Sequence, residues 1–220
     1  MKFSYKMTLA AAVLSVGATV VSASTVEVGY QERSVFGTPN LSSAVTISSP
    51  FISGRVAAGP FRLTGSGGFG DFVAFCIDLG QYMARGKTYT VSGASTYGSE
   101  VDSNISRLFN SAYASLTTAV QGAAFQVALW EIITDTGSDS GLDLGMGAFT
   151  AGANASVINQ AADYLEGLGG ASTGGYKLTF LASGQSQDLV TVSPVPVPAA
   201  FGMLGLGIAG LFGLRRRKKA

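Results

Sequence analysis

The sequence predicts an α+β domain, a β-sandwich or barrel-like structure with a helical insertion, between an N-terminal signal peptide and a short C-terminal hydrophobic helix. Two observations lead to this expectation. Apolar residues first alternate with period two, then recur with a helical period between Asp102 and Gly167, and finally alternate again. Each end of the chain instead carries an apolar run beside basic residues. We therefore expect one folded domain over residues 24–193 between two targeting segments.

Residues 1–23 have the composition of a secretory signal peptide. A basic stretch at Met1–Lys6 precedes an apolar run from Met7 to Val21. Small residues then follow at the spacing that a signal peptidase needs, so we expect cleavage after Ala23. A short membrane anchor is the other interpretation, but the run is too short for a comfortable span and ends in a cleavage pattern. The sequence thus predicts an exported protein.

Strand patterns lie on both sides of the helical region. Alternation rich in β-branched and aromatic residues predicts strands at Thr25–Tyr30, Ala44–Ser48, Phe61–Thr64, Lys87–Ser92, Tyr176–Leu181 and Leu189–Val192. In the run Phe72–Leu79 both faces are largely apolar, which predicts a central strand with Cys76 and Asp78 on the same face. The intervening run Gly65–Gly70 is a turn and not a phosphate loop, because it opens no helix and no Gly-Lys-Ser/Thr follows.

The middle of the chain is predicted to be helical. The periodic segments are Ser103–Ser111, Thr118–Thr134 and Ser156–Gly167, with start signals near Asp102, Thr117 and Ala155–Ser156. A loop rich in Gly and Asp separates the last two segments, at residues 135–154. Its Asp135, Asp139 and Asp143 are spaced by four, which does not match an EF-hand. A solvated acidic loop is the main interpretation, and calcium binding is the alternative.

The region between the targeting segments is acidic and contains no histidine. From Ser24 to Pro194 there are seven basic and thirteen acidic residues, a net charge of −6. This charge opposes binding to nucleic acid or to anionic membrane surfaces. The lack of histidine excludes Ser-His-Asp and Cys-His hydrolases in their usual forms, and with a single cysteine it excludes the common zinc sites. We expect no cofactor, no metal and no nucleic-acid partner.

Two residues stand out as a candidate reactive pair. Cys76 is the only cysteine, so it cannot form an internal disulfide and is either inert or a thiol kept for chemistry. Gln126 falls inside the apolar stripe of its predicted helix, with Val127 and Glu131 on the opposite side. A buried carboxamide needs partners for its polar atoms. It is either hydrogen-bonded to backbone or condensed with the Cys76 thiol into an internal thioester, with loss of ammonia.

The runs Phe75-Cys76-Ile77 and Phe125-Gln126-Val127-Ala128-Leu129-Trp130 resemble the motifs of thioester domains in bacterial surface adhesins. The resemblance implies a thioester-type fold between Val26 and Val192. It makes Cys76 the thiol partner and Gln126 the acyl partner. It also places Trp130 over the bond, and we hypothesise that Asp78 polarises or orients the site.

The chemistry that this resemblance implies is a single acyl transfer. An amine or hydroxyl on a surface or matrix partner attacks the Gln126 carbonyl carbon, and Cys76 leaves as a thiolate. Because no turnover follows, the protein is expected to be a covalent anchor in adhesion or biofilm and not an enzyme. The alternative is a sorted structural or carbohydrate-binding surface protein without a functional thioester.

The end of the chain resembles a PEP-CTERM sorting tail, in the VPLPA variant with Val197 in place of Leu. The predicted tail spans residues 194–220, and the motif near its start is Val195, Pro196, Val197, Pro198 and Ala199. An apolar run, Phe201–Leu214, and the basic cluster Arg215–Lys219 follow. The resemblance implies transient insertion in the inner membrane of a Gram-negative bacterium, processing by an exosortase-type protease, and delivery to the cell surface or extracellular matrix. An ordinary tail anchor is the other interpretation.

Overall fold

The computed structural model describes residues 24–194. The predicted signal peptide with its cleavage site at Ala23, the sorting motif at residues 195–199 and the predicted C-terminal helix lie outside the described residues. Those three expectations therefore have no structural counterpart below.

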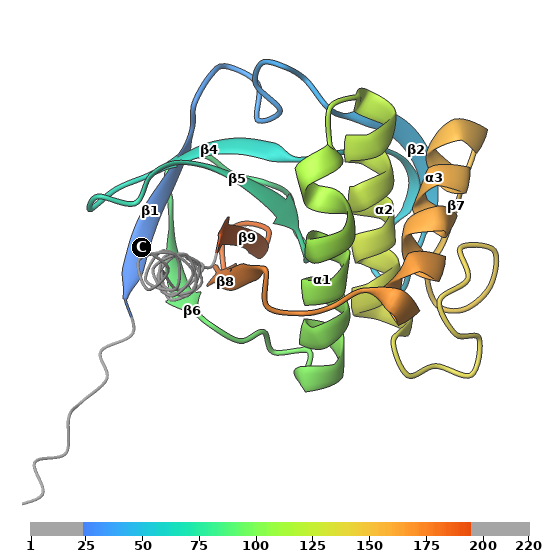
Figure 1. Cartoon of the computed structure of the whole chain (residues 1–220). Helices are drawn as coiled ribbons and strands as arrows, with labels where there is room; N and C mark the ends of the chain where they lie inside the picture. Colours follow the sequence, from blue (N-terminus) through green and yellow to red (C-terminus); the bar gives the residue numbers. More distant parts are fainter. Residues whose placement is uncertain (1–23, 195–220) are drawn as a thin grey trace, which may run out of the picture.

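Six antiparallel strands close into a barrel (Figure 1). In spatial order they are β1 (Thr25–Tyr30), β4 (Phe61–Gly65), β5 (Gly70–Cys76), β9 (Leu189–Pro194), β8 (Tyr176–Ala182) and β6 (Lys87–Ser92). The first and last strands in sequence belong to the same barrel, so the helical region between β6 and β8 is an insertion into it. The predicted combination of a barrel with a helical insertion is confirmed.

A second, three-stranded sheet lies beside the barrel. Its central strand is β2 (Ser43–Ser48), flanked by β3 (Ser53–Ala58) and β7 (Thr150–Gly152). Neither flanking strand was predicted. The β3 segment contains Gly54 and Arg55 and alternates weakly, and β7 is three residues long inside the loop predicted for residues 135–154. Both segments become strands because β2 supplies a hydrogen-bonding partner on each side.

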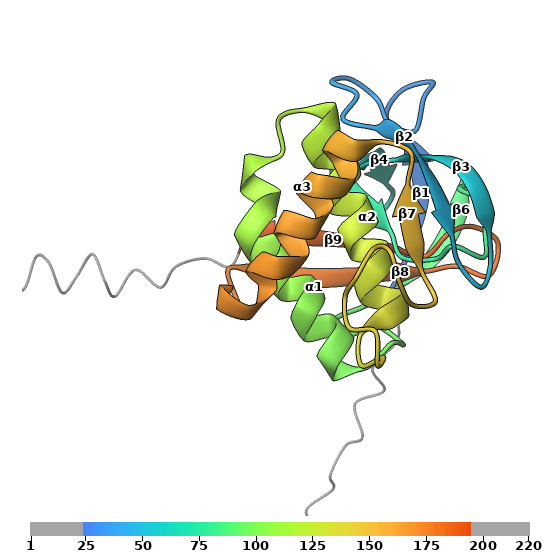
Figure 2. The ribbon, with the colours of Figure 1, turned by 90° about the vertical axis from the view of Figure 1, so that its right-hand side faces the viewer.

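Three α-helices form a layer on one side of the molecule (Figure 2). They are α1 (Ser99–Ala112), α2 (Ala119–Asp135) and α3 (Ala155–Glu166), and short 3₁₀ turns at Tyr113–Ser115 and Gly167–Gly170 follow α1 and α3. The predicted segments are correct, but α1 begins four residues earlier than expected, directly after Gly98 at φ 102°. The α2 helix starts with a capping box, in which Thr118 and Gln121 bond each other's backbone N–H.

The α2 helix is enclosed on all sides. It packs against α1 and α3 on one side and against β2, β3 and β5 on the other. The sequence predicted a single apolar stripe, with Val127 and Glu131 on the opposite side of the helix. The single stripe was wrong, because both of these residues are fully buried. Gly122 permits the close approach to the β2 side, since a Cβ there would collide with the Leu41 carbonyl oxygen.

Candidate functional site

Cys76 is the last residue of β5 and is buried, with 1% of its surface exposed. It pairs with Leu189 of β9, but β4 begins at Phe61, which pairs with Ala74, so no β4 residue pairs with Cys76. The predicted continuation of this strand to Leu79 was wrong. The end of β5 therefore presents the backbone N–H and carbonyl of Cys76 toward the helical layer.

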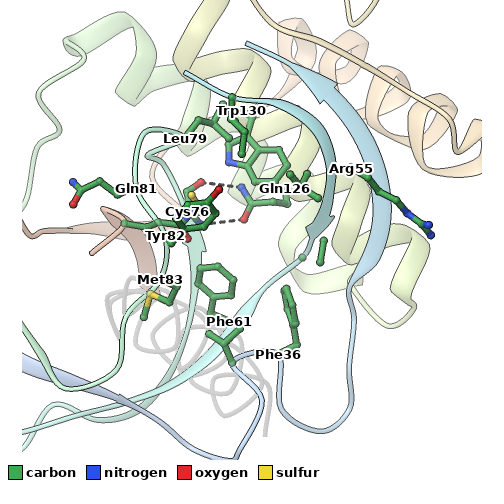
Figure 3. A pocket seen from close by; sticks show the side chains of 16 residues that line it. Phe36, Arg55, Phe61, Cys76, Leu79, Gln81, Tyr82, Met83, Gln126 and Trp130 are labelled. Atoms are coloured by element: carbon green, nitrogen blue, oxygen red, sulfur yellow. Dashed lines mark hydrogen bonds between the residues drawn. The ribbon is translucent and has the colours of Figure 1, made fainter. Parts of the chain in front are cut away.

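The structure brings Gln126 of α2 onto this free backbone (Figure 3). Its Oε1 accepts a hydrogen bond from the Cys76 N–H at 3.0 Å, and its Nε2 donates to the Cys76 carbonyl oxygen at 2.8 Å. The carboxamide thus occupies the place of a missing strand partner, with 1% of Gln126 exposed. The two residues that the sequence singled out are in direct contact.

Aromatic packing beside Cys76 and Gln126 holds the two residues in contact. Phe75 precedes Cys76 and Phe125 precedes Gln126, and their ring centroids lie 4.5 Å apart. Phe109 of α1 packs edge-on against both rings. All three residues are fully buried. Because this cluster joins β5, α1 and α2, it determines which residue of α2 faces Cys76.

The Cys76 thiol lies in a nearly water-free setting. Its Sγ donates to the Asp78 carbonyl oxygen at 3.1 Å, and the Asp78 N–H approaches the sulfur at 3.4 Å. Burial raises the pKa of the Cys76 thiol to about 12, against smaller lowering effects from the Asp78 backbone and the Trp130 indole. The thiol is therefore protonated at neutral pH, and its thiolate is a high-energy species here.

Asp78 contacts the sulfur through its backbone and uses its side chain elsewhere. The carboxylate accepts hydrogen bonds from the Gly80 N–H at 2.7 Å and from Gln81 Nε2 at 2.9 Å. These bonds shape the loop that follows β5. Polarisation of the site by the Asp78 carboxylate stays a prediction, whereas its backbone contact with the thiol is a feature of the fold.

A cavity of about 330 Å³ opens over the pair. Cys76, Gln126 and Trp130 line it together with residues that sequence reasoning missed, among them Phe36, Phe61, Leu79, Tyr82 and Met83 (Figure 3). No sequence signal marked these residues, because they come from separate loops and strands of the N-terminal half. Among the lining residues only Arg55 is charged. The cavity gives a small molecule or a partner side chain access to the Cys76–Gln126 pair.

Trp130, one helical turn after Gln126, has an unused hydrogen-bond donor. The side chain is 4% exposed, and its Nε1–H has no hydrogen-bond partner among the described residues. The indole lies near enough to Cys76 to lower the thiol pKa, but the geometry falls short of a hydrogen bond. The ring also packs on Phe149, with centroids 6.3 Å apart.

Glu131, on the other side of α2, was given no role by the sequence. It is fully buried, and neither carboxylate oxygen has a partner among the described residues. Burial, and then the charge of Asp135, raise the pKa of Glu131 to about 8. Asp135 itself accepts hydrogen bonds from the N–H groups of Ala148 and Phe149. Over residues 24–194, no three His, Cys, Asp or Glu side chains are grouped so as to hold a metal ion.

Comparison with known proteins identifies the tail. Residues 194–218 match the family model of the PEP-CTERM protein-sorting motif, which confirms the predicted sorting tail. Such a motif implies an exported protein that an exosortase processes in association with the membrane. Within residues 24–194, none of the helices has the length and apolar character needed to span a membrane. A search of curated proteins finds no match to the chain.

This chain is similar to a solved structure, the N-terminal domain of the Streptococcus pyogenes pilus tip adhesin Cpa. The two share 14% sequence identity with a TM-score of 0.47, and the match covers 81% of this chain and 97% of the other.

Proposed function

We propose that this exported protein forms an internal thioester between Cys76 and Gln126 and uses it once, to attach covalently to a nucleophile on a surface or matrix partner. The sorting tail supports delivery to the cell surface, where such an attachment serves adhesion or biofilm formation. The protein is then a chemical anchor and not an enzyme. Its partner is a group that reaches the cavity over the pair.

The observation that carries this proposal is the double hydrogen bond between the Gln126 carboxamide and the Cys76 backbone. It brings a buried carboxamide into direct contact with the backbone of the residue that carries the only thiol of the chain, 50 residues away in sequence. A reacting group held in place replaces a bimolecular step by an effectively unimolecular one. Condensation then needs only the side chain of Cys76 to meet the carbonyl carbon of Gln126.

The surroundings suit an electrophile that must persist. The Cys76 N–H bonded to Oε1 at 3.0 Å polarises the carbonyl and stabilises negative charge that develops on that oxygen during attack. The thiol pKa of about 12 makes the thiolate a poor leaving group, and burial of both residues keeps water away. The same features slow hydrolysis and leave reaction to a nucleophile that enters the cavity.

A second candidate function has its own support. Both polar ends of the Gln126 carboxamide are satisfied by backbone, as expected for a purely structural glutamine that completes a strand end. On this account the chain is a sorted structural or carbohydrate-binding surface protein, and the cavity binds its ligand without a covalent bond.

Intact mass of the secreted protein separates the two functions. A thioester lowers the mass by one ammonia, and incubation with methylamine then restores mass by adding the amine. We expect both changes in the wild-type protein and neither in Cys76→Ala. A wild-type protein that has the full calculated mass and takes up no methylamine leaves only the structural function.

A further inference from the structure

We propose that the indole N–H of Trp130 is the hydrogen-bond donor that stabilises the Cys76 sulfur as a thiolate, both when the thioester forms and when it opens. This inference rests on the proposed function and gives Trp130 a chemical role beyond packing over the bond. It makes Trp130 a catalytic residue of a reaction that occurs once.

The first support is the unused donor. Tryptophan N–H groups that are buried usually find an acceptor, because an unpaired buried donor is costly. Trp130 is 4% exposed and its Nε1–H has no acceptor among residues 24–194. It lines the same cavity as Cys76 and Gln126, and Figure 3 shows the indole nitrogen on the edge of the ring nearest Cys76. A donor held in this way gains a partner when the nearby sulfur becomes an acceptor.

The second support is how few groups beside the sulfur can help a thiolate. In the thiol form, Sγ donates its proton to the Asp78 carbonyl oxygen, which offers nothing to a negatively charged sulfur. The Asp78 N–H donates to the sulfur at 3.4 Å and is one donor that a thiolate keeps. Arg55 is the only charged residue lining the cavity, and its side chain points away from the pair (Figure 3). The indole N–H is a second donor beside the sulfur, and unlike the Asp78 N–H it has no acceptor among residues 24–194 in the thiol form.

In the opening reaction, a neutral amine attacks the carbonyl carbon that belonged to Gln126, and the carbonyl oxygen takes negative charge on the Cys76 N–H. The C–S bond breaks, and the sulfur takes the electron pair as a thiolate that accepts from Trp130. A proton from the former amine then passes to the sulfur, which leaves an amide and a free thiol. In the forming reaction, the thiol proton passes to the carboxamide nitrogen, which departs as ammonia. The donor acts on the same atom in both directions.

The test compares single-turnover rates of methylamine addition, followed by intact mass, in the mature secreted protein. Trp130→Phe removes the N–H, and replacement of Trp130 by benzothienylalanine removes it while keeping the ring shape. Phe149→Leu is the matched control, because it loosens the packing of the Trp130 ring but leaves the donor. A hydrogen bond to a charged group predicts rates about 10- to 100-fold lower in both Trp130 variants. Rates within about twofold of the wild type in the benzothienylalanine protein overturn the proposal.

A second measurement decides the role of Trp130 even if the thioester is absent. In a Gln126→Ala background the Cys76 thiol is free, and its alkylation rate by iodoacetamide at fixed pH reports the thiolate fraction. The benzothienylalanine replacement is expected to lower this rate about 10-fold or more, whereas Phe149→Leu leaves it near the background value. Equal rates with and without the N–H overturn the donor role. Failure of the wild type to lose ammonia overturns the proposed function instead.

Discussion

Two buried polar side chains on α2, Gln126 and Glu131, have opposite surroundings. Both polar ends of the Gln126 carboxamide are partnered, since Nε2 and Oε1 each bond the backbone of Cys76. The Glu131 carboxylate has no partner on either oxygen among the described residues. Burial alone therefore does not indicate the role of a polar group. The partners of that group distinguish a carboxamide held in one position from a carboxyl group that must stay neutral.

The difference has a simple chemical cause. A carboxamide carries a donor and an acceptor, so it matches the N–H and C=O of one strand residue. A carboxylate only accepts, and the lowering effect of the Asp143 backbone on the pKa of Glu131 is smaller than the cost of burying its charged form. Glu131 accordingly keeps its proton, and its pKa rises to about 8.

The largest effect is expected at the partnered residue. Gln126→Ala should abolish ammonia loss and amine uptake completely. It also leaves the buried N–H and carbonyl of Cys76 without hydrogen-bond partners, which should lower the free energy of unfolding by about 3 kcal/mol relative to Cys76→Ser. Urea denaturation and intact mass measure both effects. Cys76→Ser is the reference because it also lacks the thioester but keeps the carboxamide contacts. Equal stability of the two variants would show that these contacts do not hold α2 on β5.

The next effect is a change in pH dependence at the unpartnered acid. The pKa of Glu131 is about 8 in the folded protein against an ordinary value of 4.5, so the folded chain keeps a proton that the unfolded chain releases. The contribution of Glu131 to stability is complete below pH 4.5 and is lost as the pH rises through 8. Glu131→Gln should remove this decline in urea unfolding curves recorded across that range.

Asp163→Asn is the matched control for this pH series, because Asp163 is an exposed carboxylate on the neighbouring helix α3. Its profile should follow that of the wild type. An unchanged decline in Glu131→Gln contradicts the assignment of the pH dependence to Glu131.

The smallest effect is expected at the start of α2. Thr118→Ala removes the side-chain acceptor of the Gln121 N–H, at 3.2 Å, and should lower the free energy of unfolding by about 1 kcal/mol. Thr118→Ser keeps the hydroxyl and should restore most of this loss in thermal or urea unfolding. Because the cap lies two turns before Gln126, amine uptake should be unaffected. A loss of uptake in Thr118→Ala indicates that the cap sets the position of the whole helix.

The elements with a clear local period were predictable, and those that depend on distant partners were not. Strands β1 and β6 alternate plainly, and the start signal near Thr117 lies one residue before Thr118, the N-cap of α2. In contrast, β7 pairs Thr150 with Ser48, about a hundred residues earlier in the chain. A three-residue segment contains no sequence pattern that identifies a distant partner strand.

The residues of the candidate site also divide into those that the sequence predicts and those that it does not. Cys76 and Gln126 could be singled out because a lone thiol and a polar residue in an apolar helix are both unusual, and their motifs resemble those of a known family. The cavity over them could not, since Phe36, Phe61 and Tyr82 meet there only after the barrel closes. The burial of Glu131 was missed because a single helical stripe was assumed, whereas α2 is covered all round.

The position of β9 in the barrel bears on how the protein withstands mechanical load. Its last residue, Pro194, is also the first residue of the segment that matches the PEP-CTERM family model, so tension applied through the tail enters the domain along this strand. Since β9 is hydrogen-bonded to β5 on one side and to β8 on the other, such tension has to shear two ladders at once. A strand held on both edges resists extraction better than an edge strand held on one.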